Sequence, residues 1–176
     1  MVSYINKPYE TLNEWTSKNN IELVIEYETS DTIDAGNIIR LDVVEGTPIK
    51  DIAKITATVS EGPNYDKIVV VPSMIGWNID DAVKFIEDNH MINVELKFIT
   101  SDDNKDIIID QSKNGDIRRD EKWLITVSLG AKSELPSTVE MIDLTNLSVL
   151  RATLWLKRNN IKYELEYEFS DKVNKN

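Results

Sequence analysis

The stretch Trp15-Thr-Ser-Lys-Asn19-Asn20-Ile21 decides the fold of this chain, because a similar stretch recurs twice further on. It returns as Phe85-Ile-Glu-Asp-Asn89-His90-Met91 and again as Trp155-Leu-Lys-Arg-Asn159-Asn160-Ile161, each time 70 residues later. Self-similarity at a fixed period is typical of a tandem array built from one small structural unit. The sequence therefore predicts copies of a single module in series.

The period divides the chain into three parts. We predict a first copy over residues 1–62 and a second over 63–130, which includes a linker at 63–70; a linker and a shortened third copy occupy 131–176. A complete copy has about 65 residues, which is near the lower limit for a self-sufficient core. Each linker contains proline, which favours semi-rigid spacing. We expect an elongated rod of modules without a common interior.

The second copy shows the elements of the module most clearly. Asn78 is a typical N-cap residue, and the apolar residues that follow it recur at helical spacing. Apolar and polar residues then alternate from Ile92 to Phe98, the period of a strand with one buried face. Two more strands are expected over residues 107–111 and 122–128. The pattern predicts an α+β fold in which one helix packs on a three-stranded antiparallel sheet.

The other two copies repeat this order to different extents. In the first, Pro8 stands at the helix start, where its missing N–H has no cost, and residues 54–60 form the closing strand. In the third, Ser148 is the expected N-cap and residues 161–169 alternate regularly, but nothing corresponds to the last two strands. One helix and one strand leave apolar surface and open edges uncovered. We therefore expect either mobility beyond about residue 140 or pairing of residues 163–169 with another chain.

Composition excludes several classes of function. The net charge is −11, so polyanions such as nucleic acids are repelled. There is no cysteine, which excludes thiolate catalysis and cysteine-based metal sites, and a single histidine, His90, with no nucleophile nearby. No stretch approaches the roughly 18 apolar residues of a membrane span, and no signal peptide is visible. Membrane attachment would need an anchor outside this sequence.

The sequence predicts neither a metal site nor a cofactor site. Residues 102–106 read D-x-N-x-D, like the start of a calcium loop, but Ile107 replaces the required glycine and Lys113 the bidentate glutamate. No glycine-rich phosphate loop is present. We therefore predict that this chain is not an enzyme and holds no cofactor.

Five motifs in order resemble a known family. Val71-Pro72-Ser-Met-Ile-Gly76, the following helix, the strand ending at Ser101-Asp102, Gln111-Ser112-Lys-Asn-Gly115 and Ile125-Thr-Val-Ser128-Leu-Gly130 together resemble a PASTA domain. The match covers the second copy, most of the first and the third from Met141 onward. The first copy has Met1-Val2 in place of Val-Pro, and its residues 41–43 depart from the family's Gln-Ser-Pro.

The resemblance implies a role outside the membrane of a Gram-positive bacterium. PASTA arrays form the extracellular part of transmembrane serine/threonine kinases that regulate cell-wall growth, and the tails of some penicillin-binding proteins. There they are thought to recognise muropeptides, peptidoglycan or its lipid-linked precursor. A series of copies favours the kinase. The alternative is a structural spacer that positions a catalytic domain and binds nothing tightly.

Four residues of the second copy are candidate ligand contacts. Trp77 and Trp123 occur only in this copy and interrupt its polar pattern, so we expect them to be exposed. Arg118 and Arg119 are adjacent, and a guanidinium group suits a carboxylate ligand. An ordinary charged turn is the alternative. Three further aromatic residues share the phase of the buried helix face and are predicted to lie in the core: Trp15, Phe85 and Trp155.

Overall fold

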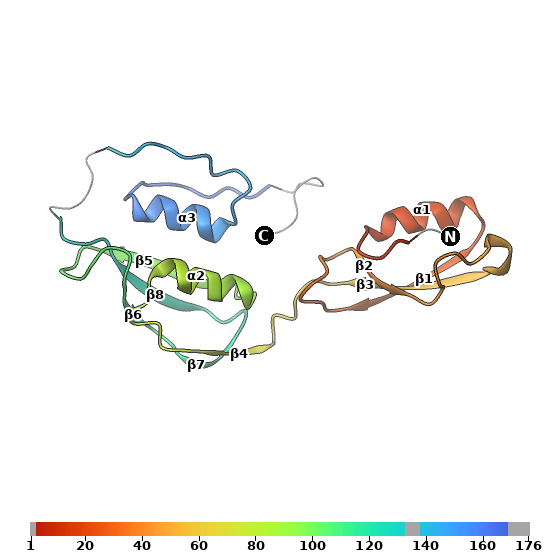
Figure 1. The fold of residues 1–176 in the computed structure, drawn as a ribbon, viewed down its shortest axis with the longest axis horizontal. Coiled ribbons are helices and arrows are strands. Elements are labelled where there is room, and N and C mark those ends of the chain that lie inside the picture. Colours follow the sequence, from red (N-terminus) through yellow and green to blue (C-terminus); the bar gives the residue numbers. More distant parts are fainter. Residues whose placement is uncertain (1–2, 133–137, 169–176) are drawn as a thin grey trace. The chain divides into compact units, whose positions relative to one another are not determined.

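The computed structural model describes residues 3–132 and 138–168 (Figure 1). The chain divides into two compact units, Met1–Asn64 and Tyr65–Asn176. Helices and small sheets make up both units, so the prediction of an α+β fold is confirmed. Within the described residues, no helix is both long enough and apolar enough to span a lipid bilayer.

The first unit contains one α-helix and one three-stranded sheet. Strand β3 lies in the middle, parallel to β1 and antiparallel to β2. The core between helix and sheet includes Leu12, Ile38 and Ile55, none of which is exposed to solvent. The elements in chain order are α1 (Tyr9–Lys18), β1 (Glu22–Glu28), β2 (Ile38–Leu41), the 3₁₀ helix η1 (Ile49–Asp51) and β3 (Lys54–Ser60).

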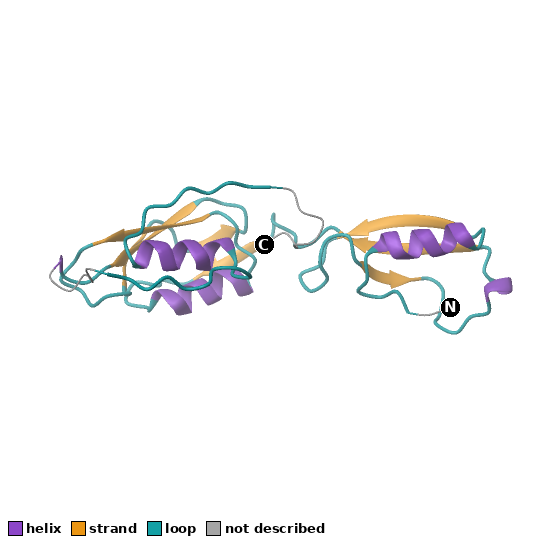
Figure 2. Cartoon of the chain, turned by 90° about the horizontal axis from the view of Figure 1, so that it is seen from above, coloured by secondary structure: helices purple, strands orange, loops and turns teal. Residues whose placement is uncertain are grey.

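The second unit repeats this arrangement and adds to it. Its three-stranded sheet has the order β5-β8-β6, and a two-stranded antiparallel sheet joins β4 to β7. Figure 2 shows the helices and strands of the unit from above. The elements are β4 (Ile68–Val71), α2 (Ile79–Asp88), β5 (Val94–Ile99), β6 (Ile108–Gln111), β7 (Gly115–Arg118), β8 (Trp123–Ser128) and α3 (Val149–Arg158).

The prediction that the three-stranded sheet is antiparallel is wrong in both units. Strands β1 and β3 run parallel, as do β5 and β8, because the last strand of each module inserts between the other two. Alternation along a strand reports which face is buried and contains no information on strand order. The sequence analysis also did not predict the sheet formed by β4 and β7, whose short strands pair across a long stretch of chain.

The third copy lacks its predicted strand. Its helix α3 begins at the expected cap, where Ser148 Oγ accepts a hydrogen bond from the Arg151 N–H at 3.2 Å. Residues 161–168 form no strand, and Leu165 and Tyr167 are exposed. A strand requires a hydrogen-bonded neighbour, and no partner strand for this stretch lies among the described residues. Met1, Val2, residues 133–137 of the second linker and Phe169–Asp171 lie outside the described residues.

A pair of polar residues ends each of the three α-helices: Asn19-Asn20, Asn89-His90 and Asn159-Asn160. The side-chain amide of the first residue donates to a backbone carbonyl four positions earlier, as in Asn89 Nδ2 to Phe85 O at 2.9 Å. The second residue has a positive φ, between 53° and 55° in all three copies. Helices commonly end with a residue in this left-handed conformation, which asparagine adopts more readily than most other residues with a side chain. His90 occupies this position, which gives the single histidine a structural role.

The first and second copies have separate cores. Tyr4, Leu12 and their neighbours form one cluster, and the half-buried Trp15 packs against it. Phe85 packs against a second cluster, built from α2 and the sheets of the second unit. That second cluster also includes Leu154 of the third copy, with Leu150 packed against it. The expectation that no interior is shared is therefore wrong for the second and third copies, because α3 packs on the second.

Gln111 connects two parts of the second unit through its side-chain amide. Its Oε1 accepts from the Met74 N–H at 2.7 Å, and its Nε2 donates to the carbonyls of Pro72 at 3.1 Å and Lys113 at 2.6 Å. Leu41 stands at the equivalent position of the first copy, where it packs against the core.

We expect Gln111→Leu to lower the free energy of unfolding of the second unit by about 1–3 kcal/mol, because it leaves these backbone groups without partners. Urea unfolding followed by circular dichroism measures the loss. The neighbouring exposed residue gives the control, since Asp110→Asn should change stability by less than about 0.5 kcal/mol. Equal stability of Gln111→Leu and the parent chain would contradict the prediction.

Candidate functional site

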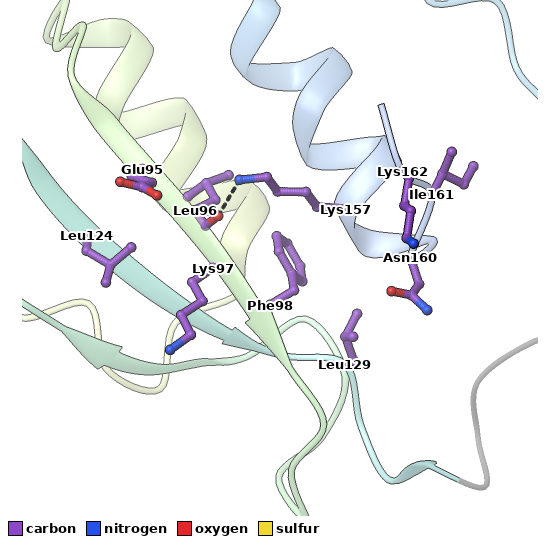
Figure 3. Close-up of a pocket in the computed structure, with 10 residues that line it drawn as sticks. All are labelled: Glu95, Leu96, Lys97, Phe98, Leu124, Leu129, Lys157, Asn160, Ile161 and Lys162. Carbon is purple, nitrogen blue, oxygen red and sulfur yellow. Dashed lines mark hydrogen bonds between the residues drawn. The ribbon is translucent and has the colours of Figure 1, made fainter. Parts of the chain in front are cut away.

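A groove of about 400 Å³ lies between β5 and the end of α3 (Figure 3). Lys97, Lys157 and Lys162 contribute three cationic side chains to it, and Glu95 contributes one carboxylate. Phe98 provides an aromatic surface between them. The remaining lining residues are Leu96, Leu124, Leu129, Asn160 and Ile161. The groove is thus lined by cationic and apolar side chains from both sides of β5.

Two polar contacts fix the walls of the groove. Lys157 Nζ donates to the Leu96 carbonyl at 2.5 Å, which joins α3 to the outer edge of β5. Glu95 forms an ion pair with Lys122 at 3.1 Å. Its hydrogen bond to Lys122 lowers the pKa of Glu95, and the charges of Lys122 and Lys157 lower it further. The carboxylate therefore stays ionised, and Lys122 offsets its negative charge.

Cationic and apolar side chains in one groove suit an anionic ligand with an apolar part. An ammonium group attracts a carboxylate or phosphate, while Leu124, Leu129 and Phe98 offer apolar contact. Lys97 and Lys162 are exposed, and Phe98 is half-buried. No group of three or more histidine, aspartate or glutamate side chains that could hold a metal ion occurs in the part of the chain that the structure describes. The groove has the chemistry of a binding site.

Arg118 is the exposed last residue of β7, next to the turn that follows the strand. Its Nε and Nη2 donate to the two carboxylate oxygens of Asp120, at 2.9 and 2.5 Å, and Asp66 Oδ1 lies 3.6 Å from Nη2. The hydrogen bond from Arg118 lowers the pKa of Asp120. The guanidinium fork is thus already engaged by a carboxylate of its own turn. This is the charged-turn alternative that the sequence left open.

The other two candidate residues that follow Arg118 in the chain are buried. Arg119 is 3% exposed and Trp123 is 2% exposed. The expectation that Trp123 is exposed is therefore wrong. It stands where the first copy has Ile55, a fully buried residue on the middle strand, so the larger side chain fills the same core position.

Trp77 lies at a different place in the unit. It is 36% exposed and precedes α2, where its carbonyl accepts from the Ile108 N–H at 2.9 Å. Ile108 pairs with Val127, whereas Trp123 is the first residue of the same strand. Four residues along a strand span about 13 Å. The structure therefore places Arg118, at the end of β7, and Arg119 near the Trp123 end of β8, and places Trp77 near the other end of β8.

Sequence reasoning missed the groove because two copies build it. Alternation identified Lys97 as an outward-facing residue of its strand, but nothing indicated that α3 would pack beside it. The one available signal is local charge. The third copy contains as many basic as acidic residues, while the first two are acidic, so its helix brings positive charge to an acidic neighbour.

Comparison with known families gives no family model that matches this chain. The chain is 31% identical over 96 residues to a probable serine/threonine-protein kinase of Clostridium acetobutylicum. The matched region is 54% of this chain and 14% of that kinase, so the similarity concerns a small part of the relative's length.

Two solved structures from Staphylococcus aureus also align with the chain. One is the entire extracellular region of the Ser/Thr kinase PrkC, at 23% identity and a TM-score of 0.35, covering 99% of this chain and 61% of that one. The other is the three-PASTA-domain of a Ser/Thr kinase, at 24% identity and a TM-score of 0.34, covering 97% and 84%. TM-scores below 0.5 do not establish a common arrangement, so neither structure supports an inference about this chain.

Proposed function

We propose that these PASTA-type repeats form the extracellular sensing region of a transmembrane serine/threonine kinase that regulates cell-wall growth in a Gram-positive bacterium. We further propose that the groove between β5 and α3 binds fragments of peptidoglycan or of its lipid-linked precursor. The observation that supports the proposal is the groove itself. Three of its lining residues are lysines, in a chain whose net charge is −11. The 31% identity over 96 residues to a probable serine/threonine-protein kinase supports a kinase as the parent protein.

The proposed ligand matches the groove in two respects. Peptidoglycan stem peptides end in carboxylates, which Lys97 and Lys162 can bind. Their short aliphatic side chains and the sugar faces are suited to contact with Phe98 and the neighbouring leucines. Exposed charge pairs contribute little each, so we expect an affinity in the micromolar to millimolar range.

Titration of the complete chain with a synthetic muropeptide, followed by amide NMR shifts, tests this proposal. We expect shifts confined to β5 and residues 157–162. The double variant Lys97→Glu and Lys162→Glu should weaken binding about tenfold or more, which corresponds to about 1.4 kcal/mol. Lys50→Glu, which makes the same kind of charge change at an exposed position of the first unit, is the matched control.

The outcomes separate the alternatives. An unchanged spectrum up to millimolar ligand would favour the structural spacer and overturn the sensing proposal. Shifts confined to Arg118 and Asp120 would instead place the site at the turn after β7, where the sequence predicted it. Equal binding by the groove variant and the control would also exclude the groove.

A further inference from the structure

We infer that the second repeat has a dedicated docking surface for a basic amphipathic helix, and that α3 occupies it. The side of α3 that docks there is opposite to the side that packs on the sheet in the complete repeats. The docking surface consists of Asp80, Val83 and Glu87 of α2, Phe98 of β5 and Asp106. This inference does not depend on any cell-wall ligand.

The buried side of α3 differs from that of the other two helices. At the 70-residue period, the buried Leu12 and Ala82 correspond to Ala152, which is only half-buried. The buried residue of α3 is instead Leu154, which is 4% exposed. Its equivalent in α2 is Lys84, which is exposed. At about 100° per residue, Leu154 and Ala152 lie on roughly opposite sides of the helix.

The docking surface supplies an apolar contact that the first repeat lacks. Val83 is fully buried, although its equivalent Asn13 in α1 is exposed. Likewise Phe98 is half-buried, whereas the equivalent Tyr27 is 62% exposed. Val83, Leu154 and the partly buried Phe98 belong to one cluster. The second repeat therefore has apolar residues at positions that are polar or open in the first.

Charged groups surround this apolar contact on both sides. The Arg151 guanidinium donates to Glu87 Oε2 at 2.8 Å from Nε and 2.6 Å from Nη2, and its Nε also donates to Oε1 at 3.1 Å. Ser148 Oγ also donates to Glu87 at 2.7 Å. At the other end of α3, Arg158 lies 2.9 Å from a carboxylate oxygen of Asp80 and 2.9 Å from one of Asp106. A bidentate arginine–carboxylate pair fixes orientation as well as contact.

Asp106 supports the specificity of this contact. Its φ is 68°, a left-handed conformation that is unfavourable for most residues with a side chain. Gly36 occupies the equivalent position of the first repeat, with a φ of 86°. The second repeat thus has a carboxylate where the backbone favours glycine, and this carboxylate faces Arg158.

The docking of α3 leaves its other side available. Ala152, Trp155 and Leu156 are half-buried and correspond to the helix face that packs on the sheet in the complete repeats. A third repeat can therefore keep its usual helix-on-sheet packing while its helix remains on the second repeat. We conclude that the contact is an interface between repeats, in which one helix serves both.

Hydrogen–deuterium exchange of the complete chain tests this inference, because an isolated ten-residue helix is too short to protect its amides. We expect the amides of α3 to be protected in dilute, monomeric samples. Leu154→Lys introduces the residue that α2 has at this position, so helix formation is retained, and protection of α3 should fall at least tenfold. Arg151→Glu should have a similar effect, and adding Glu87→Arg should restore most of the protection.

The controls keep the result specific. Arg40→Glu removes an exposed ion pair with Glu28 in the first unit and should leave α3 unchanged. Asp106→Gly relieves the left-handed strain, so a loss of α3 protection in this variant would identify the ion pair with Arg158 as its cause. Unprotected α3 amides in the parent chain, no response to Leu154→Lys, or protection that increases with protein concentration would each overturn docking within one chain.

Discussion

Replacing Trp123 by alanine is expected to lower the free energy of unfolding of the second unit by about 3–5 kcal/mol, the usual cost of removing a large aromatic side chain from a core. The indole is 2% exposed at the start of the middle strand and belongs to the core cluster of the unit. No neighbouring side chain can fill a cavity of that size without moving the strand. Denaturant unfolding followed by NMR signals assigned to the second unit measures the loss.

The second tryptophan of this copy provides the matched control. Trp77 is 36% exposed, so Trp77→Ala should cost about 1 kcal/mol or less. Trp123→Phe keeps an aromatic ring in the core and should retain most of the stability. Equal losses of unfolding free energy in Trp123→Ala and Trp77→Ala would contradict the burial of Trp123 and would favour its role as an exposed ligand contact.

Leu12→Ala is expected to unfold much of the first unit while leaving the second intact. Leu12 is fully buried under α1, and truncating such a residue costs about 2–5 kcal/mol. A unit of this size has a total stability of only about 3–9 kcal/mol, at about 0.05–0.15 kcal/mol per residue. The loss is thus comparable with the whole stability of the unit. Two-dimensional NMR should show collapsed signal dispersion for residues 3–60 and unchanged signals for β5, β6 and β8.

An exposed residue on the same helix gives the comparison for this result. Glu14→Ala alters a solvent-facing position and should change stability by less than about 0.5 kcal/mol. The contrary outcome is equally clear. If signals of the second unit broadened or disappeared in parallel with those of the first, the two cores would unfold as one, and the division into two units would be wrong.

Several local features were predictable because they depend on neighbouring residues alone. The Asn78 side chain caps α2 as expected, accepting from the Asp80 N–H at 2.9 Å. The closing strand of the first copy, Lys54–Ser60, lies where alternation placed it. The core side of α1 and α2 follows from helical spacing, as Leu12 and Ile86 show. Each of these depends on residues within one or two turns of chain.

The candidate site was only partly predictable. The side chain of Arg118 is exposed, but the carboxylate of Asp120 already engages it. The sequence analysis predicted both Trp77 and Trp123 to be exposed, but Trp123 is buried and Trp77 is not. Trp123 lies on the core-facing side of β8 with the buried Ile125 and Val127, whereas Trp77 lies in the segment before α2. Strand order follows from contacts between distant residues, which one sequence does not reveal.

The sequence by itself determined the repeating module, its helix caps, its alternating strands and its negative net charge, because periodicity and charge are local properties. Only the tertiary structure decided that the sheets are mixed, that Trp123 is buried and that α3 packs on the second repeat through Leu154. Those features depend on which strand is inserted between which others and on which of two apolar sides a helix uses. Both choices are set by the summed packing of residues far apart in the chain.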